Sequence, residues 1–137
     1  MIVLDASVVV AYFNAAERRH AEVADWLAGV AEDLVTTPLV LAEIAYVLGR
    51  RAGSVAVDTF WADLEDDIYG LRWWPRAMGQ TIDAARSSAI RVGLADASLI
   101  ALAAHLSTRR VATLDEAHFG RLRALDGAAM TLLPPRR

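Results

Sequence analysis

The chain begins Met1-Ile-Val-Leu-Asp5-Ala-Ser7, with three apolar residues directly before a carboxylate. A short apolar run of this kind is typical of a buried strand, here Ile2–Leu4. Asp5 suits a helix N-cap, and the residues after it predict a helix over Ala6–Phe13. A strand that leads at once into a helix is the usual opening of an α/β fold.

Short apolar runs and longer helical patterns alternate along the rest of the sequence. We expect further strands at residues 34–36, 71–74, 111–113 and 130–133, and helices at residues 18–30, 38–51, 55–67, 79–91 and 116–125. Leu99 and Leu106 mark one more core-facing helix after Gly93. Strands separated by helices predict a central parallel sheet covered on both faces. The sequence predicts one domain, residues 1–133, and a C-terminal tail, residues 134–137.

Composition excludes several classes of enzyme. The 137 residues contain no cysteine and no lysine, which excludes thiol catalysis, cysteine-ligated zinc, a P-loop and a Schiff-base lysine. The three histidines are scattered and form no HExxH-type motif. The formal net charge of −3 means that nucleic acid would have to bind at a local basic patch. Without an apolar stretch long enough to span a membrane, and without a leader, we expect a cytoplasmic protein.

Four acidic residues stand where a parallel sheet of this type places its functional sites: Asp5, Glu43, Asp96 and Asp115. Two of them follow predicted strands, and two lie early in predicted helices, so all four are expected at one rim of the sheet. Each also has a plain structural explanation. The aspartates are good N-caps, and the glutamate suits a solvated helix face. The joint pattern favours a site, because caps alone should fall at both edges of the sheet.

Converging carboxylates need a counter-charge. Two of them about 5 Å apart repel by about 3 kcal/mol at an effective dielectric near 20. A cluster of four therefore implies a raised pKa or a bound cation, and all-oxygen ligands favour Mg²⁺ or Mn²⁺. Such an ion can activate water for phosphoryl displacement.

The segments around these acids resemble the motifs of PIN domains. The opening segment that ends at Asp5-Ala-Ser7 is similar to the first motif, and Thr37-Pro-Leu-Val-Leu-Ala-Glu43 to the second. Leu94-Ala-Asp96-Ala-Ser98 is similar to the third, and Thr113-Leu-Asp115-Glu-Ala-His118-Phe119 to the last. Each motif alone is weak, but the four occur in the right order over nearly the whole chain.

The greatest similarity is to the toxin ribonucleases of VapBC toxin–antitoxin systems. This resemblance implies a flavodoxin-like α/β/α sandwich, dependence on Mg²⁺ or Mn²⁺, and endonucleolytic cleavage of structured RNA such as tRNA or rRNA. It also implies a homodimer that is inhibited by a cognate VapB-like antitoxin. Asp5, Glu43, Asp96 and Asp115 correspond to the metal-binding catalytic acids, and Ser7, Thr113 and Ser98 to supporting hydroxyl positions. Glu116 and Ala117 depart from the pattern, since a basic residue often precedes the histidine there.

The basic and aromatic residues are ambiguous. Arg18-Arg19-His20, Arg50-Arg51 and Arg109-Arg110 are candidates for phosphate contact, although each suits a solvated surface. Phe60-Trp61 and Trp73-Trp74 could stack on bases, but core or dimer packing explains them better.

Two other functions stay open at this point. One is a PIN-like module that binds RNA or protein without catalysis, against which the complete set of acids argues. The other is a phosphohydrolase with an aspartyl nucleophile, of the haloacid dehalogenase type. That family has a second aspartate two residues after the first, where this chain has Ser7.

Overall fold

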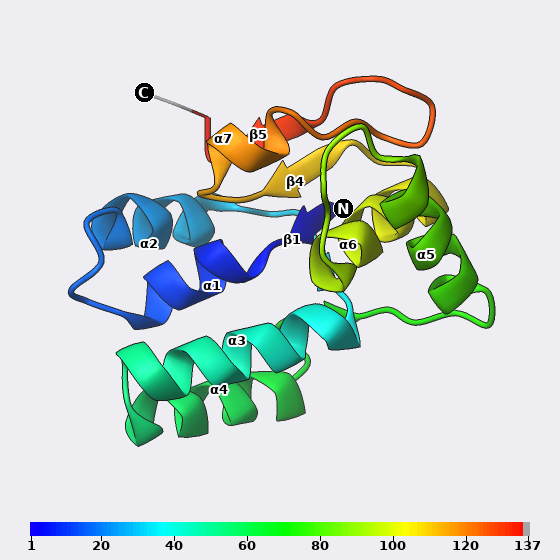
Figure 1. Ribbon diagram of the computed structural model, residues 1–137. Coiled ribbons are helices and arrows are strands. Elements are labelled where there is room, and N and C mark those ends of the chain that lie inside the picture. The colour runs from blue at the N-terminus through cyan, green and yellow to red at the C-terminus, as the bar shows by residue number, and fades with distance from the viewer. Residues whose placement is uncertain (136–137) are drawn as a thin grey trace.

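The computed structural model describes residues 1–135, and Arg136 and Arg137 of the expected tail lie outside the described residues. The strands are β1 (Ile2–Leu4), β2 (Leu34–Thr36), β3 (Gly70–Leu71), β4 (Arg110–Ala112) and β5 (Thr131–Leu133). The helices are α1 (Ala6–Phe13), α2 (His20–Gly29), α3 (Pro38–Arg51), α4 (Ser54–Glu65), α5 (Ala77–Ser87), α6 (Leu94–His105) and α7 (Glu116–Phe119). Figure 1 shows α3 beside α4 and α5 beside α6, pairs that pack against each other.

The strands form one parallel sheet in the order β3-β2-β1-β4-β5. Val3 at its centre pairs with Val35 on one side and with Val111 on the other. The chain moves outward from β1 to β3 and then returns to β4. Since crossovers between parallel strands are almost always right-handed, this reversal places helices on both faces of the sheet. The predicted three-layer α/β/α sandwich with a central parallel sheet is confirmed. All five carboxyl ends lie at one edge, and the strand order reverses there between β1 and β4.

Local sequence signals account for the elements that carry the site. Asp5 caps α1 by accepting a hydrogen bond from the backbone N–H of Ser7, as predicted. Thr37 caps α3 through the N–H of Val40, and Pro38 occupies the first helical position. Asp96 is not a cap, because Gly93 holds that position and Asp96 lies in the first turn of α6.

Most predicted boundaries lie within about two residues of the observed ones, but three predicted ends are wrong by more. The strand expected at 71–74 is β3, which ends at Leu71, and the helix expected at 79–91 is α5, which ends at Ser87. The helix expected at 116–125 ends at Phe119. The chain packs tightly at Gly120, where a Cβ would come within 2.7 Å of the carbonyl oxygen of Glu116.

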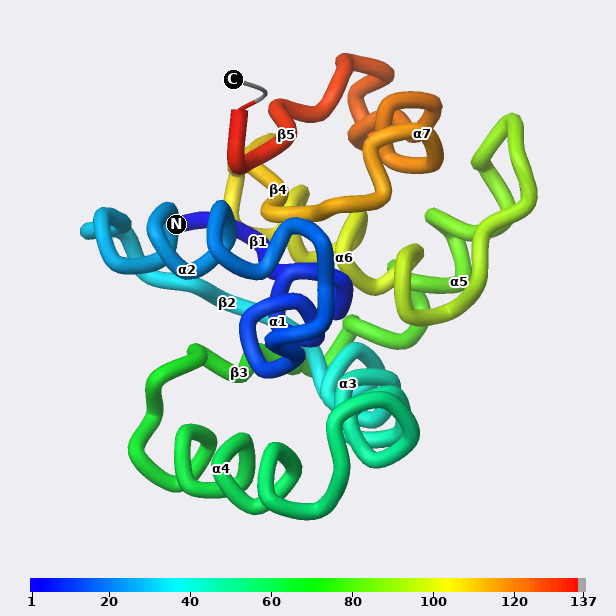
Figure 2. The backbone as a smooth tube through the Cα atoms, turned by 90° about the vertical axis from the view of Figure 1, so that its left-hand side faces the viewer, coloured from blue at the N-terminus to red at the C-terminus, as the bar shows by residue number. Residues whose placement is uncertain are grey.

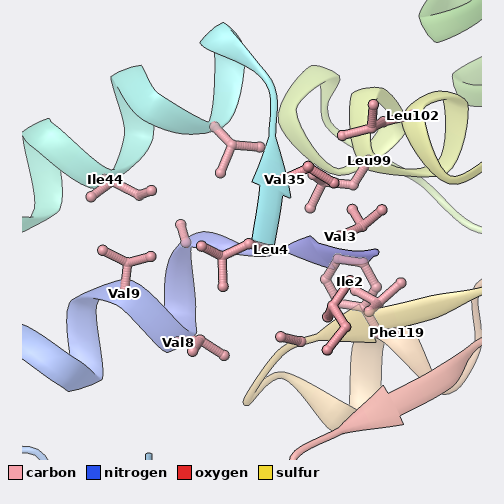
Figure 3. Close-up of a cluster of buried hydrophobic side chains, with 14 of the residues drawn as sticks. Ile2, Val3, Leu4, Val8, Val9, Val35, Ile44, Leu99, Leu102 and Phe119 are labelled. Atoms are coloured by element: carbon pink, nitrogen blue, oxygen red, sulfur yellow. The ribbon is translucent and has the colours of Figure 1, made fainter. Parts of the chain in front are cut away.

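The core lies on both sides of β1. Figure 3 shows Val9 of α1 facing Ile44 of α3, with Leu99 of α6 near β1 and β2. Phe119 of the short α7 is also buried in this cluster. The first residues of α1, α6 and α7 are thereby fixed relative to the edge of the sheet. Within residues 1–135, no helix combines the length and hydropathy needed to cross a bilayer.

Candidate active site

The four predicted acids line one pocket of about 460 Å³. Asp5 enters it from the junction of β1 and α1, Glu43 from α3, Asp96 from α6 and Asp115 from the start of α7. In Figure 2, α1, α3 and α6 lie close together in the middle of the view, with α7 above them. Residues that are up to 110 positions apart in sequence thus share one cavity.

Asp5 is held rigidly at the floor of this pocket and is only 6% exposed. Its Oδ2 accepts hydrogen bonds from the hydroxyl of Ser7 at 2.5 Å and from the hydroxyl of Thr113 at 2.9 Å. The Ser7 hydroxyl also accepts one from the N–H of Leu114 at 2.9 Å, which ties α1 to the segment after β4. Among the described residues, none donates a hydrogen bond to Oδ1 of Asp5, so this oxygen remains for a ligand.

Asp115 and His118 connect α7 to the rest of the site. Asp115 caps α7 by accepting from the N–H of His118 at 3.1 Å, and its own N–H donates to the Thr113 hydroxyl. Nε2 of His118 lies 3.0 Å from Oδ2 of Asp96. This contact joins α7 to α6 directly.

Two of the acids, Asp96 and Glu43, have raised pKa values, and the charges of neighbouring acids contribute to both shifts. Burial raises the pKa of Asp96, as does the charge of Asp5, while His118 lowers it in part. Glu43 lies at the exposed rim of the pocket. Its pKa is raised mainly by partial loss of water, and to a smaller extent by the charges of Asp5 and Asp96. Like charges thus add to burial in disfavouring the ionised forms of Asp96 and Glu43.

The donor set fits a hard divalent cation, since every acid in the pocket offers carboxylate oxygens. Within residues 1–135, no three acidic or histidine side chains already converge as a finished metal site. Asp96 is instead turned toward His118. Asp5 is held by the hydroxyls of Ser7 and Thr113.

The three supporting hydroxyl groups occupy two different places. The hydroxyls of Ser7 and Thr113 donate to Asp5 directly. Ser98 is fully buried away from the acids, where it donates to the carbonyl oxygen of Ala95 at 2.6 Å and lies 2.7 Å from the Thr37 hydroxyl. It thus fixes α6 against the start of α3.

Two residues that line the acid pocket lie outside the four acidic motifs and were not predicted from the sequence as part of the acid site. Glu17, from the segment between α1 and α2, lines this pocket and a neighbouring one. Arg51, at the end of α3, lines it two helical turns beyond Glu43. Glu116 does not line the acid pocket and is paired with Arg19 at 3.0 Å.

The aromatic pairs belong mainly to packing. Phe60 is fully buried, and the ring of Trp74 stacks on His105 with centroids 4.2 Å apart. Trp61 and Trp73 are exposed but do not line the acid pocket.

Comparison with known proteins agrees with this architecture. The family model described as PIN domain matches residues 2–125. Ribonuclease VapC26 of Mycobacterium tuberculosis is 34% identical over 140 residues, which cover 97% of this chain and all of the relative.

Solved structures show the same fold at lower identity. The chain is similar to VapC20 of Mycobacterium tuberculosis, a toxin that cleaves the sarcin-ricin loop, with a TM-score of 0.76 at 21% identity. That match covers 89% of this chain and 97% of VapC20. VapBC2 of Rickettsia felis, solved with a promoter DNA fragment, matches with a TM-score of 0.63 at 14% identity, and the match covers 96% of this chain and 98% of that one.

Proposed function

This chain belongs to the PIN-domain family, and on that basis we propose that it is an endoribonuclease dependent on Mg²⁺ or Mn²⁺. The observation that carries the proposal is the convergence of Asp5, Glu43, Asp96 and Asp115 on one pocket. The 34% identity to a ribonuclease over nearly the whole chain supports the same reaction class.

The four acids would hold the cation through their carboxylate oxygens. When bound, the cation lowers the pKa of a coordinated water and stabilises the charge that develops on the phosphate. The Ser7 and Thr113 hydroxyls both donate to Oδ2 of Asp5 and so keep its carboxylate in one orientation. The described residues include no histidine pair in the pocket that would serve as acid and base instead.

The biological role we propose is that of the toxin in a type II toxin–antitoxin system, acting on structured RNA such as tRNA or rRNA in the cytoplasm. The support is similarity to VapC26 and to the toxin component of VapBC2. The expected partners are a VapB-like antitoxin and a second copy of the chain. Exposed apolar side chains, including Trp61 and Val55 on α4, are suited to burial in such assemblies.

The test is cleavage of total tRNA and of rRNA by the purified chain with Mg²⁺, with Mn²⁺ and with chelator. Wild type should cut only with metal, and Glu43→Gln should abolish cutting. Asp126→Asn is the control, because Asp126 pairs with Arg109 and does not line the acid pocket. Binding of RNA without cleavage under every metal condition would favour a non-catalytic module.

A further inference from the structure

We infer that Arg18 and Arg51 bind backbone phosphates on opposite sides of the acid cluster, so that the RNA strand crosses the acids between them. This inference rests on the proposed nuclease function. The sequence offers three arginine pairs as candidates for phosphate contact, and the structure distinguishes two single arginines among them.

Two adjoining pockets define the path. The acid pocket is bordered by a larger one of about 780 Å³, lined by the segment that leads into α2 and by the start of α7. Glu17, Leu114 and Asp115 line both pockets. The two hollows therefore meet at the acids and offer one continuous path for an extended strand.

Arg51 stands in the acid pocket at the far end of α3. Glu43, Val47 and Arg51 follow one another at intervals of four residues, and all three line the pocket. A helix rises about 1.5 Å per residue, which places Arg51 about 12 Å along the axis from Glu43. That separation suits a phosphate beyond the scissile one. Within residues 1–135, Arg51 has no acidic partner and is exposed.

Arg18 lines the larger pocket. It is exposed and, in the part of the chain that the structure describes, forms no ion pair. Its neighbour Arg19 is already committed, since its guanidinium lies 2.7 Å from Glu22 and 3.0 Å from Glu116 and its side chain is only 17% exposed. Arg18 thus offers a guanidinium to a ligand, whereas Arg19 braces α2 against α7.

The remaining candidate arginines are engaged elsewhere. Arg50 donates to the hydroxyl of Tyr46 at 2.9 Å and lies over its ring. Arg109 pairs with Asp126 and Arg110 with Glu32. Neither of these two lines the acid pocket or the larger pocket beside it.

The acid cluster makes such flanking cations necessary. A polyanion that approaches several carboxylates in a chain of net charge −3 is repelled unless local positive charge offsets them. A guanidinium can bind a phosphate through two parallel hydrogen bonds, which also fixes the register of the strand. Arg18 and Arg51 are therefore positioning residues for the substrate.

The test measures binding of fluorescein-labelled total tRNA to full-length Arg51→Gln, Arg18→Gln and Arg50→Gln, over a range of salt concentrations in Ca²⁺. Loss of one phosphate contact should weaken binding roughly ten-fold and reduce the slope of log affinity against log salt by about 0.7 to 1. Arg50→Gln is the matched control, one residue from Arg51 but directed at Tyr46. Arg51→Lys should restore the salt slope and part of the affinity.

Cleavage of the same RNA with Mg²⁺ separates the possible results. KM should rise in Arg18→Gln and Arg51→Gln, with kcat less affected, and Arg50→Gln should match wild type. If wild type cleaves tRNA and all three variants bind it equally, or all three weaken equally, the strand path is wrong while the nuclease function stands. If wild type neither binds nor cleaves RNA, the nuclease function fails and the path with it.

Discussion

Replacement of Asp96 by asparagine should stabilise the protein in the absence of divalent cations. Burial and the charge of Asp5 raise the pKa of Asp96 in the folded state. A raised pKa means that the folded protein binds more protons than the unfolded chain between the ordinary aspartate pKa, about 3.9, and the folded value. The free energy of unfolding therefore falls as the pH rises through this window, and Asp96→Asn removes that loss.

The size of the effect follows from opposing contributions. Two carboxylates about 5 Å apart repel by about 3 kcal/mol at an effective dielectric near 20, which sets an upper bound. Weakening of the contact between Asp96 and His118 at 3.0 Å, a charge-assisted bond, offsets about 1.5 kcal/mol or more. We expect a net gain of about 1 kcal/mol at pH 7, or about 3 to 4 °C in Tm for a chain of this size.

Differential scanning calorimetry at pH 4 and pH 7 with chelator measures this gain, which should nearly disappear at the lower pH. Asp126→Asn is the control, and it should lower Tm at pH 7 instead of raising it. The reason is that the N–H of Ala128 and the guanidinium of Arg109 lower the pKa of Asp126 in the folded state. Added Mg²⁺ should reverse the order, because wild type gains more from binding than the variant. If Asp96→Asn melts at or below the temperature of wild type at pH 7 without metal, the repulsion does not outweigh the contact with His118, and the predicted net gain is wrong.

The other predictions concern the support of the site and its partners. Thr113→Val should cost about 1 to 2 kcal/mol of unfolding free energy in urea, because Asp5 loses a buried hydrogen bond; an unchanged midpoint would contradict this. Sedimentation at micromolar concentration should show a two-fold dimer, and a monomer would count against the predicted assembly. An arginine near the antitoxin C-terminus should pair with the acid cluster and compete with Mg²⁺. Replacement of that arginine by alanine should therefore weaken inhibition most at low Mg²⁺, and inhibition that persists unchanged at every metal concentration would mean that the antitoxin only covers the RNA path.

Local signals made the centre of the fold predictable. The run before Asp5, the Thr37-Pro38 pair and the apolar residues of α3 each specify their own structure over a few positions. Their order along the chain specifies a parallel sheet, and the parallel sheet brings Asp5 and Asp115 to one edge.

Errors arose where tertiary packing replaced a local pattern. Trp73-Trp74 suggested strand, but Trp74 stacks on His105 and donates its indole N–H to Gln80 at 2.7 Å. The helix expected to reach residue 125 ends at Phe119, and Leu122 beyond it is buried without being helical.

The additional pocket residues could not be predicted, since their place depends on tertiary structure. Glu17 reaches the acids only because α2 packs back on α1. Arg51 reaches them because α3 keeps the same face toward the pocket for two turns. Arg50 and Arg51 are indistinguishable in sequence, and only the direction of α3 separates their roles.

The most direct test of the account is to compare Mn²⁺ binding and RNA cleavage, in wild type and in Asp5→Asn, over one titration. We predict that cleavage of tRNA or rRNA by wild type rises with occupancy of the site and stops with chelator. Asp5→Asn should remain folded, bind Mn²⁺ at least ten-fold more weakly and leave the RNA intact. Equal cleavage by Asp5→Asn, or undiminished cleavage by wild type in chelator, would contradict the claim that these acids hold a catalytic cation.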